Sequence, residues 1–258
     1  MGLLQDKIVL VNGGSQGVGA AVARAAAREG AVVTVTGRRP GPGEALAAEL
    51  ADAGATSAYL RCDLADPAQA RGSVEAVVAV HGRVDCLVNA AGLTSRGTLL
   101  DTTPELFDAH IAVNLRGPFF AMQAAVADMV ARSAPGAIVN VISSSAHGGQ
   151  PFLAPYVAAK AGLAGLTRNA AHAHRFDRVR INGLNIGWTD TEGEDATQRA
   201  FHGAGDDWRE EAGRRLPMGR LGRADEIADF VVLLLSDRSG VVTGSILDWD
   251  QNVLGGLD

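Results

Sequence analysis

The feature that most constrains the fold is a rhythm in which short runs rich in Val and Ile alternate with longer Ala-rich segments. This alternation predicts an α/β architecture: a doubly wound, seven-stranded parallel sheet with helices on both faces. Most of the short runs are apolar throughout, as is typical of strands that are covered on both faces. The predicted strands are Ile8–Asn12, Val32–Thr36, Ser57–Arg61, Cys86–Asn89, Ala137–Ile142, Arg180–Leu184 and Ser245–Asp248.

Several of the Ala-rich segments begin with proline or end at glycine, as helices prefer. The predicted helices are Gly19–Glu29, Gly43–Asp52, Pro67–His81, Pro104–Arg132, Pro155–His174 and Ala224–Ser236. A length of 258 residues suits one α/β domain over residues 1–258, because a chain of this size buries a sufficient core. The exception to the rhythm is residues 188–215, a polar, glycine-containing insertion in which we expect a loop or short helices over the site.

Composition narrows the choice of partners. The formal charge is −6 and the basic residues are scattered, so no stripe is available to neutralise a nucleic-acid backbone. Cys62 and Cys86 lie far apart with no ligand set around them, which predicts neither a disulfide nor a metal site. No apolar run approaches the roughly 20 residues of a membrane span, and the N-terminus does not resemble a signal peptide. We expect a cytoplasmic protein that binds a small molecule.

A glycine-rich turn, residues 12–19, lies between the first predicted strand and the first predicted helix. Glycines allow the backbone to approach a pyrophosphate, whose charge meets free amides and the positive end of the helix dipole. A plain strand–helix loop is the alternative interpretation. The residues predicted to bind the cofactor at this turn are Gly13, Ser15, Gln16, Gly17, Val18 and Gly19, with the glycines in the pattern GxxxGxG.

The end of the second predicted strand bears on the choice of cofactor. Gly37 stands where a site that prefers NAD usually has an acidic residue for the ribose hydroxyl. Arg38 follows and can form charge-assisted bonds with a 2′-phosphate or stack on adenine. The pattern favours NADP over NAD, unless Arg38 and Arg39 are merely solvated loop charges.

A possible reacting pair is Tyr156 and Lys160, which are four residues apart and so share one face of a helix. A free phenol has a pKa near 10, and a neighbouring ammonium together with a positive nicotinamide would lower it enough for proton transfer near pH 7. An exposed surface pair is the alternative. Ser143 lies 13 residues before Tyr156 at the end of a predicted strand, and either Ser144 or Ser145 could take its place.

These motifs, in this order, resemble the short-chain dehydrogenase/reductase family of Rossmann-fold, NAD(P)-binding oxidoreductases. The resemblance extends from the glycine turn to Val242-Thr243-Gly244 and implies a homo-oligomer, a tetramer. The catalytic residues that it implies are Asn114, Ser143, Tyr156 and Lys160. The further cofactor-binding residues that it implies are Asp63, Leu64, Asn89, Ala91, Gly92, Tyr156, Lys160, Gly187, Thr189 and Thr191.

In the resemblance, Tyr156 is the acid/base, Ser143 holds the substrate oxygen, and Asn114 kinks its helix and holds a water that leads to Lys160. The sequence departs from the family pattern at Asn12 in place of Thr, at Ala90 in place of Asn, and at Ile186 in place of Pro. The last change puts the local rigidity of residues 185–191 in doubt, because a fixed φ angle is lost.

Two segments are expected to border the substrate. The candidate substrate residues are Ser143, His147, Gln150 and Trp188, with Glu192, His202 and Trp208 nearby in sequence. Their mixture of polar groups and rings is typical of sugar or polyol binding, although loop surface or oligomer contacts would also account for it.

The function predicted from the sequence is hydride transfer between NAD(P) and the alcohol or carbonyl group of a small polar substrate such as a sugar or polyol. One alternative is a reductase of 3-oxoacyl thioesters, which would need a basic patch for an acidic carrier protein. Another is a non-catalytic NAD(P)-sensing regulator, because a fold does not fix a function. Such a regulator would have no need of Tyr156, Lys160 and Ser143.

Overall fold

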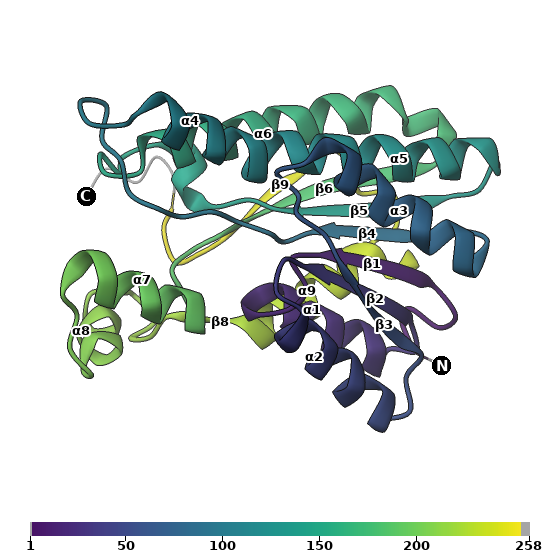
Figure 1. Ribbon diagram of the computed structural model, residues 1–258, viewed down its shortest axis with the longest axis horizontal. Helices are drawn as coiled ribbons and strands as arrows, with labels where there is room; N and C mark the ends of the chain where they lie inside the picture. Colours follow the sequence, from purple (N-terminus) through teal and green to yellow (C-terminus); the bar gives the residue numbers. More distant parts are fainter. Residues whose placement is uncertain (1, 254–258) are drawn as a thin grey trace.

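The seven-stranded parallel sheet predicted from the sequence is confirmed in the computed structural model, which describes residues 2–253 (Figure 1). The strand order is β3-β2-β1-β4-β5-β6-β9, and every neighbouring pair is parallel. The strands are β1 Ile8–Asn12, β2 Val32–Gly37, β3 Ser57–Arg61, β4 Cys86–Asn89, β5 Gly136–Val141, β6 Val179–Ile186 and β9 Ile246–Trp249.

Helices cover both faces of the sheet, so that each face has its own apolar core (Figure 1). One layer consists of α1 Gly17–Arg28, α2 Pro40–Asp52 and α9 Ala224–Leu235. The other consists of α3 Pro67–His81, α4 Pro104–Ile111, α5 Gly117–Ala131 and α6 Ala154–Ala173. The alanines of α1 that face the core let this helix pack closely against α9 and the sheet, because small side chains shorten the distance between elements.

The predicted helix Pro104–Arg132 is not one regular helix. A π-helical segment, Ala112–Arg116, separates α4 from α5. π-Helical turns bend a helix and are frequent at functional sites. Asn114 lies in this segment with its side chain fully buried, which agrees with the position where the sequence predicted a kink.

The insertion, residues 188–215, lies apart from the sheet at the carboxyl ends of the strands (Figure 1). It contains α7 Glu192–His202 and α8 Trp208–Arg214, and the short strand β7 Thr189–Asp190 pairs with β8 Gly222–Arg223. Short helices were one of the two predicted forms. Because ligands of doubly wound sheets bind outside the carboxyl ends of the strands, the insertion covers the edge where a site is expected.

A row of hydrogen-bonded polar side chains crosses the buried centre of the sheet; we call it the polar row. Thr36 Oγ1 donates to Asn12 Oδ1 (3.0 Å), and Asn12 Nδ2 donates to Asn89 Oδ1 (3.1 Å). Asn89 Nδ2 donates to Asn140 Oδ1 (2.8 Å), whose own Nδ2 donates to Thr167 Oγ1 (2.9 Å). The row links β2, β1, β4, β5 and α6, and its strand residues are also register partners, so it fixes the alignment of the strand ends below the site.

Within residues 2–253, no helix combines the length and the apolar character that crossing a bilayer would require.

Candidate active site

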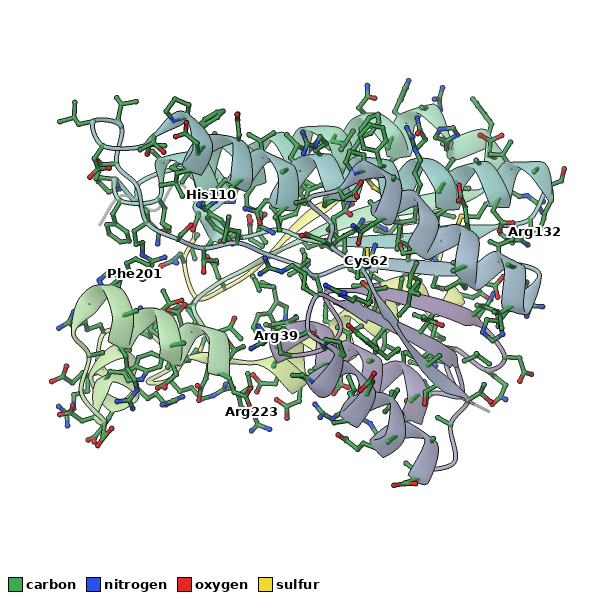
Figure 2. The ribbon with its side chains drawn as sticks, in the orientation of Figure 1. Arg39, Cys62, His110, Arg132, Phe201 and Arg223 are labelled. Carbon is green, nitrogen blue, oxygen red and sulfur yellow. The ribbon has the colours of Figure 1, made fainter. Side chains whose placement is uncertain are left out.

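A large cleft of about 1780 Å³ follows the carboxyl edge of the sheet, with lining residues drawn from Gly13 to Asn252. It lies between the sheet and the insertion, and Figure 2 shows Arg39 on the side of α2 and Phe201 on the side of α7. We distinguish a dinucleotide half, formed by the glycine turn and the ends of β2 and β3, from a substrate half beside the insertion.

The glycine turn packs so closely that side chains would not fit. A Cβ atom on Gly13, which has a φ of 76°, would lie 2.4 Å from the backbone nitrogen of Ala91. A Cβ atom on Gly19 would lie 2.2 Å from the carbonyl oxygen of Gly13. No side chain caps the start of α1 at Gln16, which leaves helix N-terminal amides for an anion. The turn therefore fits the pyrophosphate of a dinucleotide.

The residues predicted for the adenosine end lie around the same half of the cleft. Asp63 and Leu64 line it after β3, and Arg38 lines it with an exposed side chain. Arg39 donates a hydrogen bond to Gln16 Oε1. A Cβ atom on Gly37 would lie 2.6 Å from Ser15 Oγ, so this position is closed to larger residues unless Ser15 moves.

Tyr156 and Lys160 lie together on α6 and line the floor of the cleft. Lys160 Nζ donates to the carbonyl oxygen of Val141 (2.8 Å) and lies 5.7 Å from the centroid of the Tyr156 ring. Burial lowers the pKa of Lys160 to about 8, so the amine keeps most of its charge at neutral pH.

The expected lowering of the Tyr156 pKa is not found in the protein alone. Burial raises the pKa of Tyr156 to about 12, although hydrogen bonding with Ser143 acts in the opposite direction. The desolvation of the phenol outweighs its polar neighbours, and the ammonium of Lys160 is engaged with Val141. Formation of a phenolate near neutral pH therefore needs positive charge beyond that of Lys160, which a bound nicotinamide would add.

Three serines follow β5, and the structure distinguishes between them. Ser143 Oγ accepts from the backbone N–H of Ser145 (3.2 Å) and donates to Ser145 Oγ (3.1 Å). Ser145 Oγ in turn donates to Gln150 Oε1. Ser143 is the serine whose hydrogen bonding affects the pKa of Tyr156, so it is the best placed of the three to share a ligand with the phenol.

Asn114 acts on the backbone of the loop after β4. Its Oδ1 accepts from the N–H of Leu93 (2.9 Å), and its Nδ2 donates to the carbonyl oxygen of Leu93 (3.0 Å). The same Nδ2 lies 3.3 Å from Nδ1 of His110, whose ring meets that of Tyr156 edge-on at 6.1 Å between centroids. Asn114 therefore supports the wall behind Tyr156, and the water expected beside it stays a prediction.

Four of the predicted site residues do not line the cleft: Gly19, Asn89, Asn114 and His147. Gly19 serves the packing of the glycine turn, and Asn89 belongs to the polar row. His147 Nε2 lies 2.8 Å from Oδ1 of Asp248 on β9, which also accepts from Asn185 Nδ2 (2.7 Å). His147 is thus engaged with the edge strand rather than turned toward a substrate.

The remaining predicted residues do line the cleft. They are Gly13, Ser15, Gln16, Gly17, Val18, Arg38, Asp63, Leu64, Ala91, Gly92, Ser143, Gln150, Tyr156, Lys160, Gly187, Trp188, Thr189 and Thr191. Thr191 also caps α7, because its hydroxyl accepts from the N–H of Glu194 (3.1 Å).

The substrate half contains residues that the sequence analysis missed. Glu194 Oε1 accepts from Trp188 Nε1 and from Gln198 Nε2, each at 2.7 Å. Trp188 also stacks on Trp208, with 6.1 Å between ring centroids. Arg96, from the loop after β4, lines the same half. Its place in the loop that follows β4, at the edge where parallel sheets carry their sites, was a signal that could have found it.

A buried phenol beside a dinucleotide turn can exchange protons while the cofactor exchanges hydride. The fold and the cleft therefore define an NAD(P)-dependent oxidoreductase that acts on alcohol and carbonyl groups.

Known proteins agree with this class. Residues 13–252 match the family model described as enoyl-(acyl carrier protein) reductase. An L-rhamnose 1-dehydrogenase (NAD(P)(+)) of Azotobacter vinelandii is 37% identical, with 95% of each chain covered.

Two further matches extend the comparison. A 3-oxoacyl-[acyl-carrier-protein] reductase of Thermotoga maritima is 34% identical, over 97% of this chain and 99% of that one. The crystal structure of a short-chain type dehydrogenase/reductase from Mycobacterium marinum superposes with a TM-score of 0.89 at 29% identity, over 98% and 97% of the two chains. The chain belongs to the short-chain dehydrogenase/reductase family.

Proposed function

We propose that the protein interconverts a secondary alcohol and a carbonyl on a small polyhydroxylated substrate, a sugar, sugar acid or polyol. The observation that carries the proposal is the position of Tyr156, between the dinucleotide half and a substrate half walled by Gln150, Glu194 and Gln198. Each of these side chains uses one polar atom on a neighbour within the protein, and its other polar atom would face an apolar ligand without a partner, at about 1–3 kcal/mol. The L-rhamnose 1-dehydrogenases of A. vinelandii and of a Sphingomonas strain, at 37% and 35% identity, support this substrate class.

The roles of the reacting residues follow from their places. NAD(P), when bound, supplies or accepts the hydride. Tyr156 exchanges a proton with the substrate oxygen, and Ser143 holds that oxygen by a hydrogen bond. The charge of Lys160 favours the phenolate, and Asn114 holds the loop behind the phenol through Leu93.

The proposed cofactor is NADP in preference to NAD. Arg38 lines the dinucleotide half with a guanidinium for which no hydrogen bond or ion pair is found among residues 2–253, whereas Arg39 is engaged with Gln16. A free guanidinium suits a 2′-phosphate. The other cofactor contacts are proposed at the remaining residues of the dinucleotide half and at Gly187, Thr189 and Thr191.

The second candidate is reduction of 3-oxoacyl thioesters, which the name of the T. maritima relative favours. The carboxylate of Glu194 in the substrate half and the net charge of −6 make a long acyl chain on an acidic carrier a poorer fit. A purely sensing role would leave the grouping of Tyr156, Ser143 and Lys160 without a purpose.

The test is turnover of a panel of aldoses, aldonates, alditols and 3-oxoacyl thioesters, each with NAD and with NADP. We expect oxidation of at least one polyhydroxylated compound, with the higher kcat/KM in the presence of NADP. Turnover of thioesters alone would contradict the proposed substrate class.

We further propose a single domain, a homotetramer and a cytoplasmic location. The buried, unpaired Cys62 and Cys86 fit a reducing compartment. Sedimentation equilibrium should give a mass four times the 26.6 kDa of the chain, and a monomeric mass would contradict the tetramer.

A further inference from the structure

Arg96 is a cation of the substrate half that has no carboxylate beside it. Its side chain is half-buried and lines the cleft, and its Nη1 donates to the carbonyl oxygen of Thr94 (2.7 Å). None of the ion pairs formed within residues 2–253 includes it. By contrast, Arg220, which also lines the cleft, is paired with Glu226 (2.7 Å).

The aromatic rings around Arg96 shield its guanidinium from water and bring no negative charge to it. The centre of the guanidinium lies 5.3 Å from the ring centroid of Phe152 and 5.8 Å from that of Phe201. Its Nη2 lies 3.1 Å from Nε2 of His202, an uncharged acceptor when the ring is neutral. Burial lowers the pKa of Arg96, which shows that the cation is partly desolvated. A partly desolvated cation that forms no ion pair, and on which the carboxylate of Glu194 acts only from a longer distance, favours an incoming anion.

Arg96 is also close to the reacting group. Its positive charge lowers the pKa of Tyr156, whereas the carboxylate of Glu194 raises it, so both charged groups act on the phenol across the cleft. A small ligand with one oxygen at Tyr156 can therefore extend to Arg96. His202 is next to the guanidinium and can add a second contact to the same ligand group.

We propose that Arg96 binds a carboxylate of the substrate, so that the preferred substrates are hydroxy acids of the aldonate type. This inference rests on the proposed function and selects sugar acids from among sugars, sugar acids and polyols. In the oxidation, the carbinol carbon gives its hydride to NAD(P)⁺ and the hydroxyl gives its proton to Tyr156. The product is a keto acid whose carboxylate is unchanged at Arg96.

The experiment compares aldonates with the alditols of the same configuration, for example D-gluconate with D-glucitol and D-galactonate with galactitol. With the wild-type protein and NADP⁺, we expect kcat/KM to be at least about tenfold higher for the acids, since a charge-assisted bidentate pair contributes about 1.5–3 kcal/mol. Arg96→Met should raise KM for the acids at least about tenfold and leave KM for the alditols nearly unchanged. Arg96→Lys should restore part of the preference.

The matched control is Arg175→Met, which removes a guanidinium stacked on Phe176, 4.4 Å from its centroid, in residues that do not line the cleft. It should change neither KM. If Arg96→Met weakens acids and alditols equally, Arg96 merely fastens Phe201 and His202 of α7 to the protein, and the inference is overturned. Equal turnover of acids and alditols by the wild type overturns it as well.

Calorimetric titration of the NADPH-loaded protein with D-gluconate and D-galactonate separates the two proposals. Binding that depends on Arg96 without any turnover of sugars, sugar acids or polyols would support the inference and contradict the proposed function. Turnover of neutral sugars without binding of either acid would support the function and overturn the inference. Absence of both turnover and acid binding would overturn both.

Discussion

Tyr156 differs from the other tyrosine of the chain, Tyr59, in that its hydroxyl belongs to a buried group at the cleft floor. In Tyr156→Phe the ring still packs against His110, but no proton can be exchanged with a substrate oxygen. We expect turnover to fall below about a hundredth of the wild-type rate, given the usual ~10²–10⁴ contribution of an acid/base group. The dissociation constant for NADPH, measured by fluorescence titration, should change less than about twofold. Greater residual activity would contradict the assignment.

We expect the charge of Lys160 to affect the pH dependence of turnover through the pKa of Tyr156. Alcohol oxidation requires the phenolate, and burial raises the pKa of Tyr156 to about 12, so kcat/KM for oxidation should rise with pH while kcat/KM for carbonyl reduction falls. Removing the positive charge in Lys160→Met disfavours the phenolate and should move the oxidation profile at least about one pH unit higher. Profiles of the two proteins that coincide would exclude an electrostatic role for Lys160.

Arg38 is the residue through which cofactor preference can be tested. Introducing an acid at Gly37 would conflict with Ser15 Oγ, 2.6 Å from the added Cβ, so a change at Arg38 alone is cleaner. Arg38→Ala should raise KM for NADP about tenfold and leave KM for NAD nearly unchanged, because only the 2′-phosphate loses a partner. Arg61→Ala is the matched control, because Arg61 is exposed and does not line the cleft, and it should change neither KM. Wild-type protein that already prefers NAD would contradict the choice of NADP.

Residues whose roles depend on local spacing could be predicted, and residues whose roles depend on distant loops could not. Tyr156 and Lys160 are one helical turn apart, so their shared face follows from the sequence. The environment of Arg96 depends on Phe152 and Phe201, which are distant in sequence and lie beside the guanidinium only in the folded chain. His147 was predicted to contact the substrate because the sequence does not show that Asp248 of β9 lies within hydrogen-bond distance of its imidazole.

Among the elements, α7 and α8 of the insertion are joined through the carboxylate of Asp195. Asp195 accepts from Trp208 Nε1 (2.7 Å), from Arg209 Nη1 (2.9 Å) and from Arg199 Nε (2.9 Å). These donors lower the pKa of Asp195 to about 2. A carboxyl whose pKa is depressed on folding stabilises above its unfolded value near 4, and this contribution is lost as the pH falls toward 2.

Asp195→Ala should loosen α7 and α8 while leaving the sheet intact. We expect faster proteolysis within residues 188–215 and a higher KM for substrate, with the main thermal transition nearly unchanged, because the insertion lies apart from the sheet. Asp206→Ala is the matched control, since the Asp206 side chain is 97% exposed and Arg199 is its only ion-pair partner within residues 2–253. Equal proteolysis of both variants would show that Asp195 does not fasten the insertion.

The elements of the sheet were more predictable than those around the cleft. All seven strands were predicted, most of them from apolar runs, because strands covered on both faces leave a continuous pattern; the half-exposed edge strands β3 and β9 were placed from the alternation of strands and helices. The break in Pro104–Arg132 follows from Asn114 bonding the backbone of Leu93, a contact between distant segments. The start of α7 had a local signal that was not used: Thr191 and Glu194 form the spacing of a helix cap.

At the scale of the whole molecule, the polar row connects both halves of the sheet. Asn140→Ala would leave the buried Asn89 Nδ2 without its acceptor, and Thr167 Oγ1 would keep only its bond to the carbonyl oxygen of Leu163. We expect the free energy of unfolding to fall by about 2–4 kcal/mol, measured by urea denaturation. Asn169→Ala, on the exposed side of α6, is the control and should change it by less than about 0.5 kcal/mol. Similar values for the two variants would mean that the row contributes little.

The edge position of β9 has a consequence for synthesis of the chain on the ribosome. Until Ile246–Trp249 has been translated, β6 is an uncovered edge that bears Ile181 and Leu184, the kind of template on which nascent chains associate wrongly. Asp248 and Trp249 also line the cleft, so the same late residues complete the site. A messenger RNA truncated before the codon for Ile246 should therefore yield an inactive polypeptide that chaperones and proteases remove, although it encodes every other strand of the sheet.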